Sequence, residues 1–153
     1  MSITNERERV EAVVSTGDSC RIMNLLSGKR ALLVDDVEIN RAVARNVLES
    51  FAISVEEAED GIMAVEKFGE AEEGYYDFII MDIQMPKMNG YEATESIRKM
   101  EKNGKASVIV ALTSNITGED RRKCFKAGMD GHLGKPVNAN ALYSTLCGLM
   151  SGN

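Results

Sequence analysis

The chain has 153 residues, of which 44% are hydrophobic, and a net charge of −6 at neutral pH. This size accommodates one domain with a sizeable core, and the negative charge, with no concentrated basic patch, argues against nucleic-acid binding. No apolar stretch approaches the ~20 residues needed to cross a bilayer, and the charged N-terminus lacks the features of a signal peptide, so we expect a cytoplasmic protein without a membrane segment.

The beginning of the chain differs from the rest. A short helix is predicted over residues 5–14, and the polar stretch over 15–19 ends it. We interpret residues 1–28 as a linker or N-terminal arm, residues 29–150 as the folded domain and residues 151–153 as a tail.

From residue 29 onward, apolar strands alternate with amphipathic helices. The predicted elements are, in chain order, a strand over 30–34, a helix over 37–50, a strand over 53–58, a helix after Gly61, a strand over 78–81, a helix over 90–102, a strand over 107–112, a helix over 117–127, a strand over 131–134 and a helix over 138–150. Five such units with fully apolar strands predict an α/β fold, a parallel sheet covered on both faces. Right-handed crossovers then favour a flavodoxin-like doubly wound (βα)5 sheet with strand order 2-1-3-4-5.

Three carboxylates fall at the predicted ends of two strands of this sheet. Asp35 and Asp36 follow the strand over 30–34, and Asp82 follows the strand over 78–81. Ligands of such sheets bind outside the carboxyl ends of the strands, at the switch between the first and third strands. Crowded carboxylates repel one another unless a cation lies between them, and hard oxygen ligands suit Mg²⁺. We therefore predict a metal site; the alternative is that the adjacent pair of acids only caps the following helix.

Asp82 is also the candidate nucleophile. A carboxylate can take up a phosphoryl group as an aspartyl phosphate, and this transfer depends mainly on positioning and on donors for the phosphoryl oxygens. Thr113 and Lys135, at the predicted ends of the fourth and fifth strands, offer a hydroxyl and an ammonium group. The backbone N–H groups of Ile83 and Gln84 are expected to bind the same oxygens. Alone, the threonine or the lysine would be an ordinary structural or solvated residue; together they predict a reactive site.

At this point the residues resemble the receiver domain of two-component response regulators. The matching segments cover about four-fifths of the chain and are Leu33–Asp36 with Asn40, Ala58–Gly61, Met81–Gly90, Ala111–Thr113, Ala127–Gly131 and Lys135–Pro136. The resemblance implies that Asp82 accepts a phosphoryl group from a phosphohistidine, carried by a partner histidine kinase or histidine phosphotransfer domain.

The resemblance also implies a ligand set and a geometry. Mg²⁺, or Mn²⁺, would be held by Asp35, Asp36 and Asp82 together with the backbone carbonyl of Gln84. Lys135 and Thr113 would sense the phosphoryl group. The peptide bond between Lys135 and the following proline is expected to be cis, as is common in the family.

Two positions depart from the family pattern. His132 lies three residues before Lys135, where an aromatic ring usually reports phosphorylation by turning inward with Thr113. We interpret His132 either as a solvent-facing residue of an edge strand or as a smaller, titratable switch residue. Phe51 stands where a glycine commonly ends the helix, so we expect the turn after the helix over 37–50 to be unusual.

Among receivers, the chain is most similar to those of hybrid sensor histidine kinases; a stand-alone regulator is the other form considered. We interpret it as a phosphoacceptor and not an enzyme, whereas a full-length hybrid parent would be a histidine kinase. Two alternatives are a pseudo-receiver that only binds partners and an aspartyl-phosphate phosphohydrolase, although Gln84 stands where haloacid-dehalogenase-like enzymes have a second aspartate. We expect output by protein contact through the helix over 117–127, the strand over 131–134 and the helix over 138–150, which also form the candidate homodimer face.

Overall fold

The computed structural model describes residues 26–101, 107–114 and 117–151, so the helix predicted over 5–14 lies outside the described residues. Along the described part, strands and helices alternate as β1 (Arg30–Val34), α2 (Glu38–Ser50), β2 (Ser54–Ala58), α3 (Gly61–Glu70), β3 (Phe78–Asp82), α4 (Gly90–Met100), β4 (Val108–Thr113), α5 (Gly118–Ala127), β5 (Gly131–Gly134) and α6 (Ala139–Ser151). The predicted elements of this part of the chain are confirmed, with bounds that shift by one or two residues.

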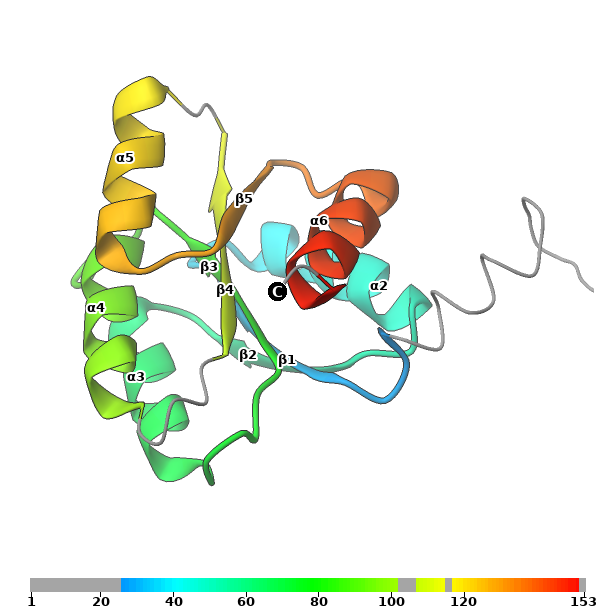
Figure 1. Cartoon of the computed structure of the whole chain (residues 1–153), viewed down its shortest axis with the longest axis horizontal. Coiled ribbons are helices and arrows are strands. Elements are labelled where there is room, and N and C mark those ends of the chain that lie inside the picture. The colour runs from blue at the N-terminus through cyan, green and yellow to red at the C-terminus, as the bar shows by residue number, and fades with distance from the viewer. Residues whose placement is uncertain (1–25, 102–106, 115–116, 152–153) are drawn as a thin grey trace, which may run out of the picture.

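The strands form one parallel sheet in the order β2-β1-β3-β4-β5, which confirms the predicted doubly wound fold. Helices α2 and α6 cover one face, and α3, α4 and α5 cover the other (Figure 1). Each face has its own hydrophobic core, because side chains alternate between the two faces along every strand. Among the described residues, we find no helix that is both long enough and apolar enough to cross a membrane.

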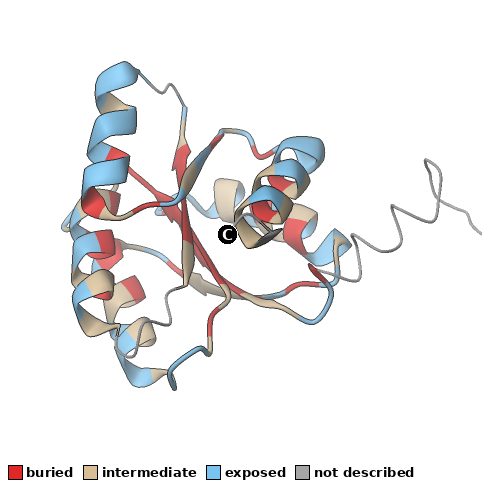
Figure 2. Ribbon diagram, viewed as in Figure 1, coloured by how far each residue is buried: buried red, intermediate tan, exposed pale blue. Residues whose placement is uncertain are grey.

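The central strand β3 explains why the sheet is so firmly held. All five of its residues are buried, and buried residues follow the central strands in Figure 2. Ile80 packs in the core beneath α2 and α6, whereas Ile79 packs in the core beneath α3, α4 and α5. Burying one such side chain contributes about 1.5–3 kcal/mol. Asp82, the candidate nucleophile, therefore stands at the end of a fully buried strand.

Local signals in the sequence fix both ends of α5 and the start of α6. Thr117 and Asp120 form a capping box at the start of α5, and Gly128 ends that helix in a left-handed conformation with φ of 108°. Asn138 accepts a hydrogen bond from the backbone N–H of Ala141, as expected for the cap of α6.

The turn after α2 is unusual, as the sequence predicted at Phe51. Phe51 itself has an ordinary φ of −99°, and the left-handed position falls one residue later, on Ala52, with φ of 63°. Residues other than glycine rarely adopt this backbone conformation. The peptide bond between Lys135 and Pro136 is cis, as predicted.

Candidate functional site

The carboxyl edge of the sheet brings the three predicted acids together. Asp82 is the last residue of β3, and its predecessor Met81 lies beside Val34, the last residue of β1. The residues that follow Val34 therefore come to lie beside Asp82. The carboxylates of Asp35, Asp36 and Asp82 each place an oxygen within 4.8 Å of the others.

The acid pair does not serve as the cap of α2. The N-cap position is Val37, which makes no side-chain capping bond. Oδ1 of Asp35 instead accepts a hydrogen bond of 2.9 Å from the backbone N–H of Val37, two residues later. The Asp36 side chain is exposed at the mouth of the site. The capping alternative therefore does not describe these two aspartates.

Lys135, the predicted cation, reaches these acids from the end of the edge strand β5. Nζ of Lys135 lies 2.9 Å from Oδ1 of Asp82 and 3.2 Å from Oδ2 of Asp35. The backbone N–H of Lys135 donates to the carbonyl of Thr113 over 3.0 Å, and Thr113 is the last residue of β4. The structure thus places Asp35, Asp82, Thr113 and Lys135 at adjoining strand ends.

The electrostatics of this cluster are unbalanced. Asp35 is 0% exposed and Asp82 is 2% exposed, and burial, together with the nearby charge of Asp35, raises the pKa of Asp82 to about 6 against the opposing effect of Lys135. Three carboxylates and one ammonium group leave an excess of two negative charges. Oδ2 of Asp82 is buried, and none of the described residues forms a hydrogen bond with it. A buried, unpartnered oxygen beside two more carboxylates fits a divalent cation with oxygen ligands.

One expectation for the phosphoryl-binding N–H groups is wrong. The N–H of Ile83 donates to the carbonyl of Leu112 over 3.1 Å, because the ladder between β3 and β4 continues one residue beyond Asp82. That donor is therefore used by the sheet. The N–H of Gln84 instead points back to Oδ1 of Asp82 over 3.3 Å, and so remains at the site.

Two contributors to the site were not identified from the sequence. Gly90 begins α4 directly against β3, and a Cβ atom there would lie 2.4 Å from the carbonyl oxygen of Asp82. Only glycine permits this approach; its place in the Asn-Gly pair that starts the helix was the available signal. Arg41 donates to the carbonyl of Asp35 over 2.8 Å, a contact without a local sequence signal.

His132 lies on the edge strand β5 and is exposed. Its strand neighbour is Ala111, whose side chain belongs to the core covered by α3, α4 and α5, so His132 is on that side of the sheet. This is the position described by the solvent-facing interpretation.

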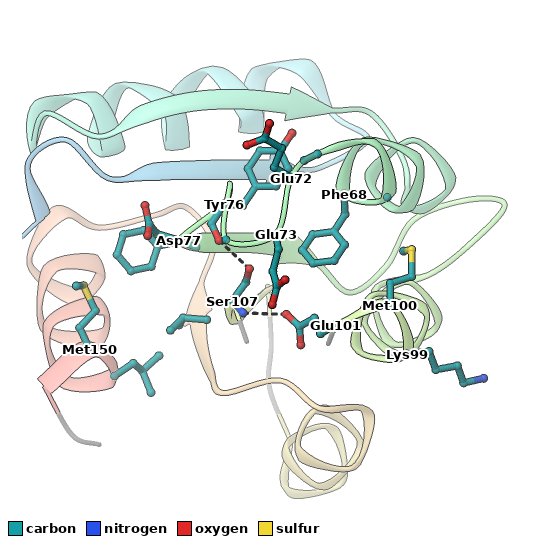
Figure 3. A pocket seen from close by; sticks show the side chains of 16 residues that line it. Phe68, Glu72, Glu73, Tyr76, Asp77, Lys99, Met100, Glu101, Ser107 and Met150 are labelled. Carbon is teal, nitrogen blue, oxygen red and sulfur yellow. Dashed lines mark hydrogen bonds between the residues drawn. The ribbon is translucent and has the colours of Figure 1, made fainter. Parts of the chain in front are cut away.

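A cavity lies at the opposite, amino edge of the sheet (Figure 3). This cavity of about 800 Å³ is lined by the ends of α3, α4 and α6 and the starts of β3 and β4. Its polar groups are used internally: the Ser107 hydroxyl donates a hydrogen bond to the carbonyl of Tyr76, and the Ser107 backbone N–H donates to the carboxylate of Glu101. None of the predicted site residues is among the described residues that line it. The clustered aspartates and Lys135 lie at the carboxyl edge.

Comparison with known proteins places this geometry in a family context. Residues 31–146 match the response regulator receiver domain family. Histidine kinase 3 of Arabidopsis thaliana is 37% identical over 141 residues, which cover 80% of this chain but only 13% of that kinase. The chain thus corresponds to a small part of this curated relative.

Two solved structures extend the similarity to three dimensions. The receiver domain of the histidine kinase CKI1 from Arabidopsis thaliana, complexed with Mg²⁺ and BeF₃⁻, has 35% identity and a TM-score of 0.77, over 86% of this chain and 95% of that one. The structure of Ypd1 with the receiver domain of Ssk1, from Saccharomyces cerevisiae, has 32% identity and a TM-score of 0.68, over 76% and 85% of the two chains.

Proposed function

The chain belongs to the response regulator receiver domain family, and from this we propose that it accepts a phosphoryl group on Asp82 as a step in a phosphorelay. The observation that carries the proposal is the carboxylate of Asp82 itself. It is buried at the end of β3 and held through Oδ1 by Lys135, and within residues 26–101, 107–114 and 117–151 no group donates a hydrogen bond to its Oδ2.

The proposed transfer is a displacement at phosphorus. A carboxylate oxygen of Asp82 forms the new P–O bond, the P–N bond of the phosphohistidine donor breaks, and its electron pair stays on the imidazole nitrogen. The product is an acyl phosphate on Asp82. Such transfers require positioning and charge stabilisation more than covalent assistance from the protein. Lys135 is placed to stabilise the new negative charge, since its ammonium already contacts the attacking carboxylate.

Asp35, Asp36 and Asp82, with the backbone carbonyl of Gln84, are the proposed ligands of Mg²⁺ or Mn²⁺. The unpartnered Oδ2 of Asp82 and the excess of negative charge support this assignment. A divalent cation at this position supplies charge neutralisation for the phosphoryl oxygens. The CKI1 receiver domain, which has a similar fold, was crystallised with Mg²⁺ and BeF₃⁻.

Thr113 and His132 are the proposed elements of the readout. Thr113 ends β4 beside the strand end that carries Lys135, so its hydroxyl group can follow a phosphoryl group on Asp82. His132 lies on the edge strand β5, which pairs with β4, and its side chain is exposed. An inward turn of its ring upon phosphorylation would change the surface formed by α5, β5 and α6, where the side chain of Phe125 is also exposed. We propose that this surface carries the output and any homodimer contact.

The phosphodonor is proposed to dock on the start of α2. Val37, Ile39 and Val43 expose apolar side chains there, Ile39 being 67% exposed. The backbone N–H of Val37 donates a hydrogen bond to Asp35, which with Asp36 and Asp82 forms the acid pocket. Exposed apolar groups next to a reactive site are typical of protein interaction surfaces. The structure of Ypd1 with the Ssk1 receiver provides a related pairing of a phosphotransfer protein with a receiver. Ile39→Ala should slow transfer from a phosphorylated histidine phosphotransfer domain and leave labelling by acetyl phosphate unchanged.

In this role the chain, with residues 29–150 as the receiver unit, takes up one phosphoryl group and passes on a signal, whereas kinase activity would belong to a longer hybrid parent. The phosphohydrolase alternative is not favoured, since Gln84 replaces the acid such enzymes need two residues after the nucleophile.

The experiment is labelling of the full chain with acetyl phosphate and Mg²⁺, followed by intact mass spectrometry. The wild type should gain one phosphoryl group, and Asp82→Asn should gain none. Glu70→Gln, which removes an exposed acid at the last residue of α3, toward the amino edge of the sheet, is the control and should be labelled like the wild type. Equal labelling of Asp82→Asn and the wild type would contradict the proposed function.

A further inference from the structure

Arg41, in the first turn of α2, reaches back to the acidic end of β1. One NH1 hydrogen bond of 2.8 Å runs to the carbonyl oxygen of Asp35, and its Nε donates over 2.9 Å to Oε1 of Glu57. The side chain is only 11% exposed. A nearly buried guanidinium group thus bridges the backbone at the acid pair and a carboxylate near the end of β2.

The backbone between β1 and α2 determines where the two acids point. Asp35 lies just beyond β1, and α2 begins at Glu38 without a side-chain cap. Asp35 uses its own Oδ1 to hold the N–H of Val37, so its carboxylate and the backbone of this loop are oriented together. A hydrogen bond that fixes the Asp35 carbonyl therefore also fixes the directions of the Asp35 and Asp36 side chains.

Glu57 keeps the guanidinium in place. It lies one residue before the end of β2, and the strand neighbour of Glu57 on β1 is Leu33, two residues before Asp35. Because Arg41 is planar and makes two bonds in fixed directions, anchoring Nε on Glu57 directs NH1 to the Asp35 carbonyl. The charge of Arg41 is neutralised by Glu57, so Arg41 acts on the acid pair chiefly through this directed bond.

Arg45 provides an internal comparison. It lies one helical turn further along α2 and pairs with the other oxygen of Glu57, but its second partner is Glu49 on the same helix. It is 40% exposed. The two arginines thus share one acidic partner on β2, and of the two, Arg41 is bonded to the loop that carries the acid pair.

We propose that Arg41, oriented by Glu57, is a positioning residue that holds the Asp35–Asp36 backbone in the geometry required for metal binding at the acid pocket. The inference rests on the proposed function and adds to it a residue outside the ligand set. Groups that orient metal ligands from outside the coordination sphere commonly change metal affinity by about 10–100-fold when removed.

The test is the Mg²⁺ affinity of the full chain, measured by titration of its backbone amide NMR signals, which also report whether each variant is folded. Arg41→Ala and Glu57→Gln should bind Mg²⁺ about tenfold more weakly than the wild type. Arg41→Lys, which keeps the charge but cannot make both directed bonds, should lie between the wild type and Arg41→Ala. Arg45→Ala should stay within about twofold of the wild type.

The outcomes separate the two levels of the account. Wild-type Mg²⁺ affinity in Arg41→Ala, or an equal loss in Arg45→Ala, would overturn the role of Arg41 and leave the proposed function standing. Absence of Mg²⁺ binding by the wild type would contradict the proposed metal site itself. If Arg41→Ala does not fold, the ranking of Glu57→Gln and Arg41→Lys against Arg45→Ala decides, since a purely structural role would leave the three folded variants with equal affinity.

Discussion

The two edges of the sheet treat their acidic residues in opposite ways. At the amino edge, the loop before β3 carries Tyr75 and Tyr76, whose hydroxyls donate hydrogen bonds to Glu56 in the middle of β2. These bonds lower the pKa of the Glu56 carboxyl group, and Asp77 accepts a hydrogen bond from the backbone N–H of Arg30. At the carboxyl edge, burial raises the pKa of Asp82 to about 6. Acids at the first edge are matched with donors and stabilise the fold.

Acids at the second edge are crowded together at a cost in stability. Oδ2 of Asp82 lacks a hydrogen-bond partner within the described part of the chain, and Asp35 and Asp82 share Lys135 as their cation. Such unbalanced charge is typical of functional sites, where stability is given up for reactivity. Stability measurements should therefore distinguish the two edges, because removing an aspartate charge should lower stability at the amino edge and raise it at the carboxyl edge.

The largest effect is expected for Lys135→Ala. Removing the cation leaves Asp35 and Asp82 buried and uncompensated, and breaking such a pair costs about 2–3 kcal/mol, given that Lys135 is partly exposed. Added Mg²⁺ should restore more stability to this variant than to the wild type, because a metal at the acid pocket takes over the lost positive charge. Urea unfolding with and without Mg²⁺ checks this; equal unfolding midpoints for variant and wild type would remove the basis for the comparison.

Asp82→Asn should have the opposite sign. Without metal at pH 7.5, a neutral amide in place of the ionised carboxylate removes the cost of burying a charge and the repulsion with Asp35. The free energy of unfolding should therefore rise by about 1–2 kcal/mol. The matched change at the amino edge is Asp77→Asn. It removes the charge of the carboxylate that accepts a hydrogen bond from the backbone N–H of Arg30, so it should lower the free energy of unfolding. Chemical denaturation measures the stability of both variants; a loss of stability in Asp82→Asn would contradict the cost assigned to the crowded carboxylates.

Sequence patterns alone predicted most of the carboxyl edge. The apolar runs in the sequence show where each strand ends, and parallel strands place their carboxyl ends at one edge of the sheet. These two facts predict a common site for Asp35, Asp36, Asp82, Thr113 and Lys135. The patterns could not show how far the ladder between β3 and β4 extends, and so they assigned the Ile83 N–H wrongly.

Sequence patterns do not predict side-chain contacts between distant segments. The bond from Arg41 to Glu57 joins residues 16 positions apart on a helix and a strand, and it depends on side-chain directions that periodicity does not contain. The amino-edge loop around Tyr75 and Tyr76 carried no motif, although its hydrogen bonds to Glu56 are among the clearest polar contacts of the fold.

A smaller effect, about 1 kcal/mol, is expected for Glu56→Gln, because the variant loses charge-assisted hydrogen bonds from the two tyrosine hydroxyls. The pKa of Glu56 is lower in the folded state than its ordinary value of 4.5. The stabilisation by Glu56 is therefore complete well above pH 4.5 and is lost as pH falls through the lowered pKa. Thermal unfolding from pH 7 to pH 3 should show the variant and the wild type converging; a constant difference would exclude this origin. Glu59→Gln, at an exposed acid, serves as the control.

The smallest effect is expected at Ala52, in the turn that leads into β2 at the amino edge. Its left-handed φ of 63° suits glycine better than alanine, so Ala52→Gly should stabilise the fold by about 0.5–1 kcal/mol. Ala71→Gly, at a position with φ of −82°, should bring no gain. Denaturant titration distinguishes them, and a change in acetyl phosphate labelling with Ala52→Gly would contradict the separation of the two edges.

The central claim is that the phosphoryl group resides on Asp82. The most direct measurement is borohydride reduction of the chain after treatment with acetyl phosphate and Mg²⁺, followed by peptide sequencing in the mass spectrometer, since reduction of an acyl phosphate converts the modified aspartate to homoserine. The account predicts homoserine at position 82, with none formed when Mg²⁺ is withheld. Homoserine at position 35 or 36, or a phosphoryl group found on His132, would contradict it.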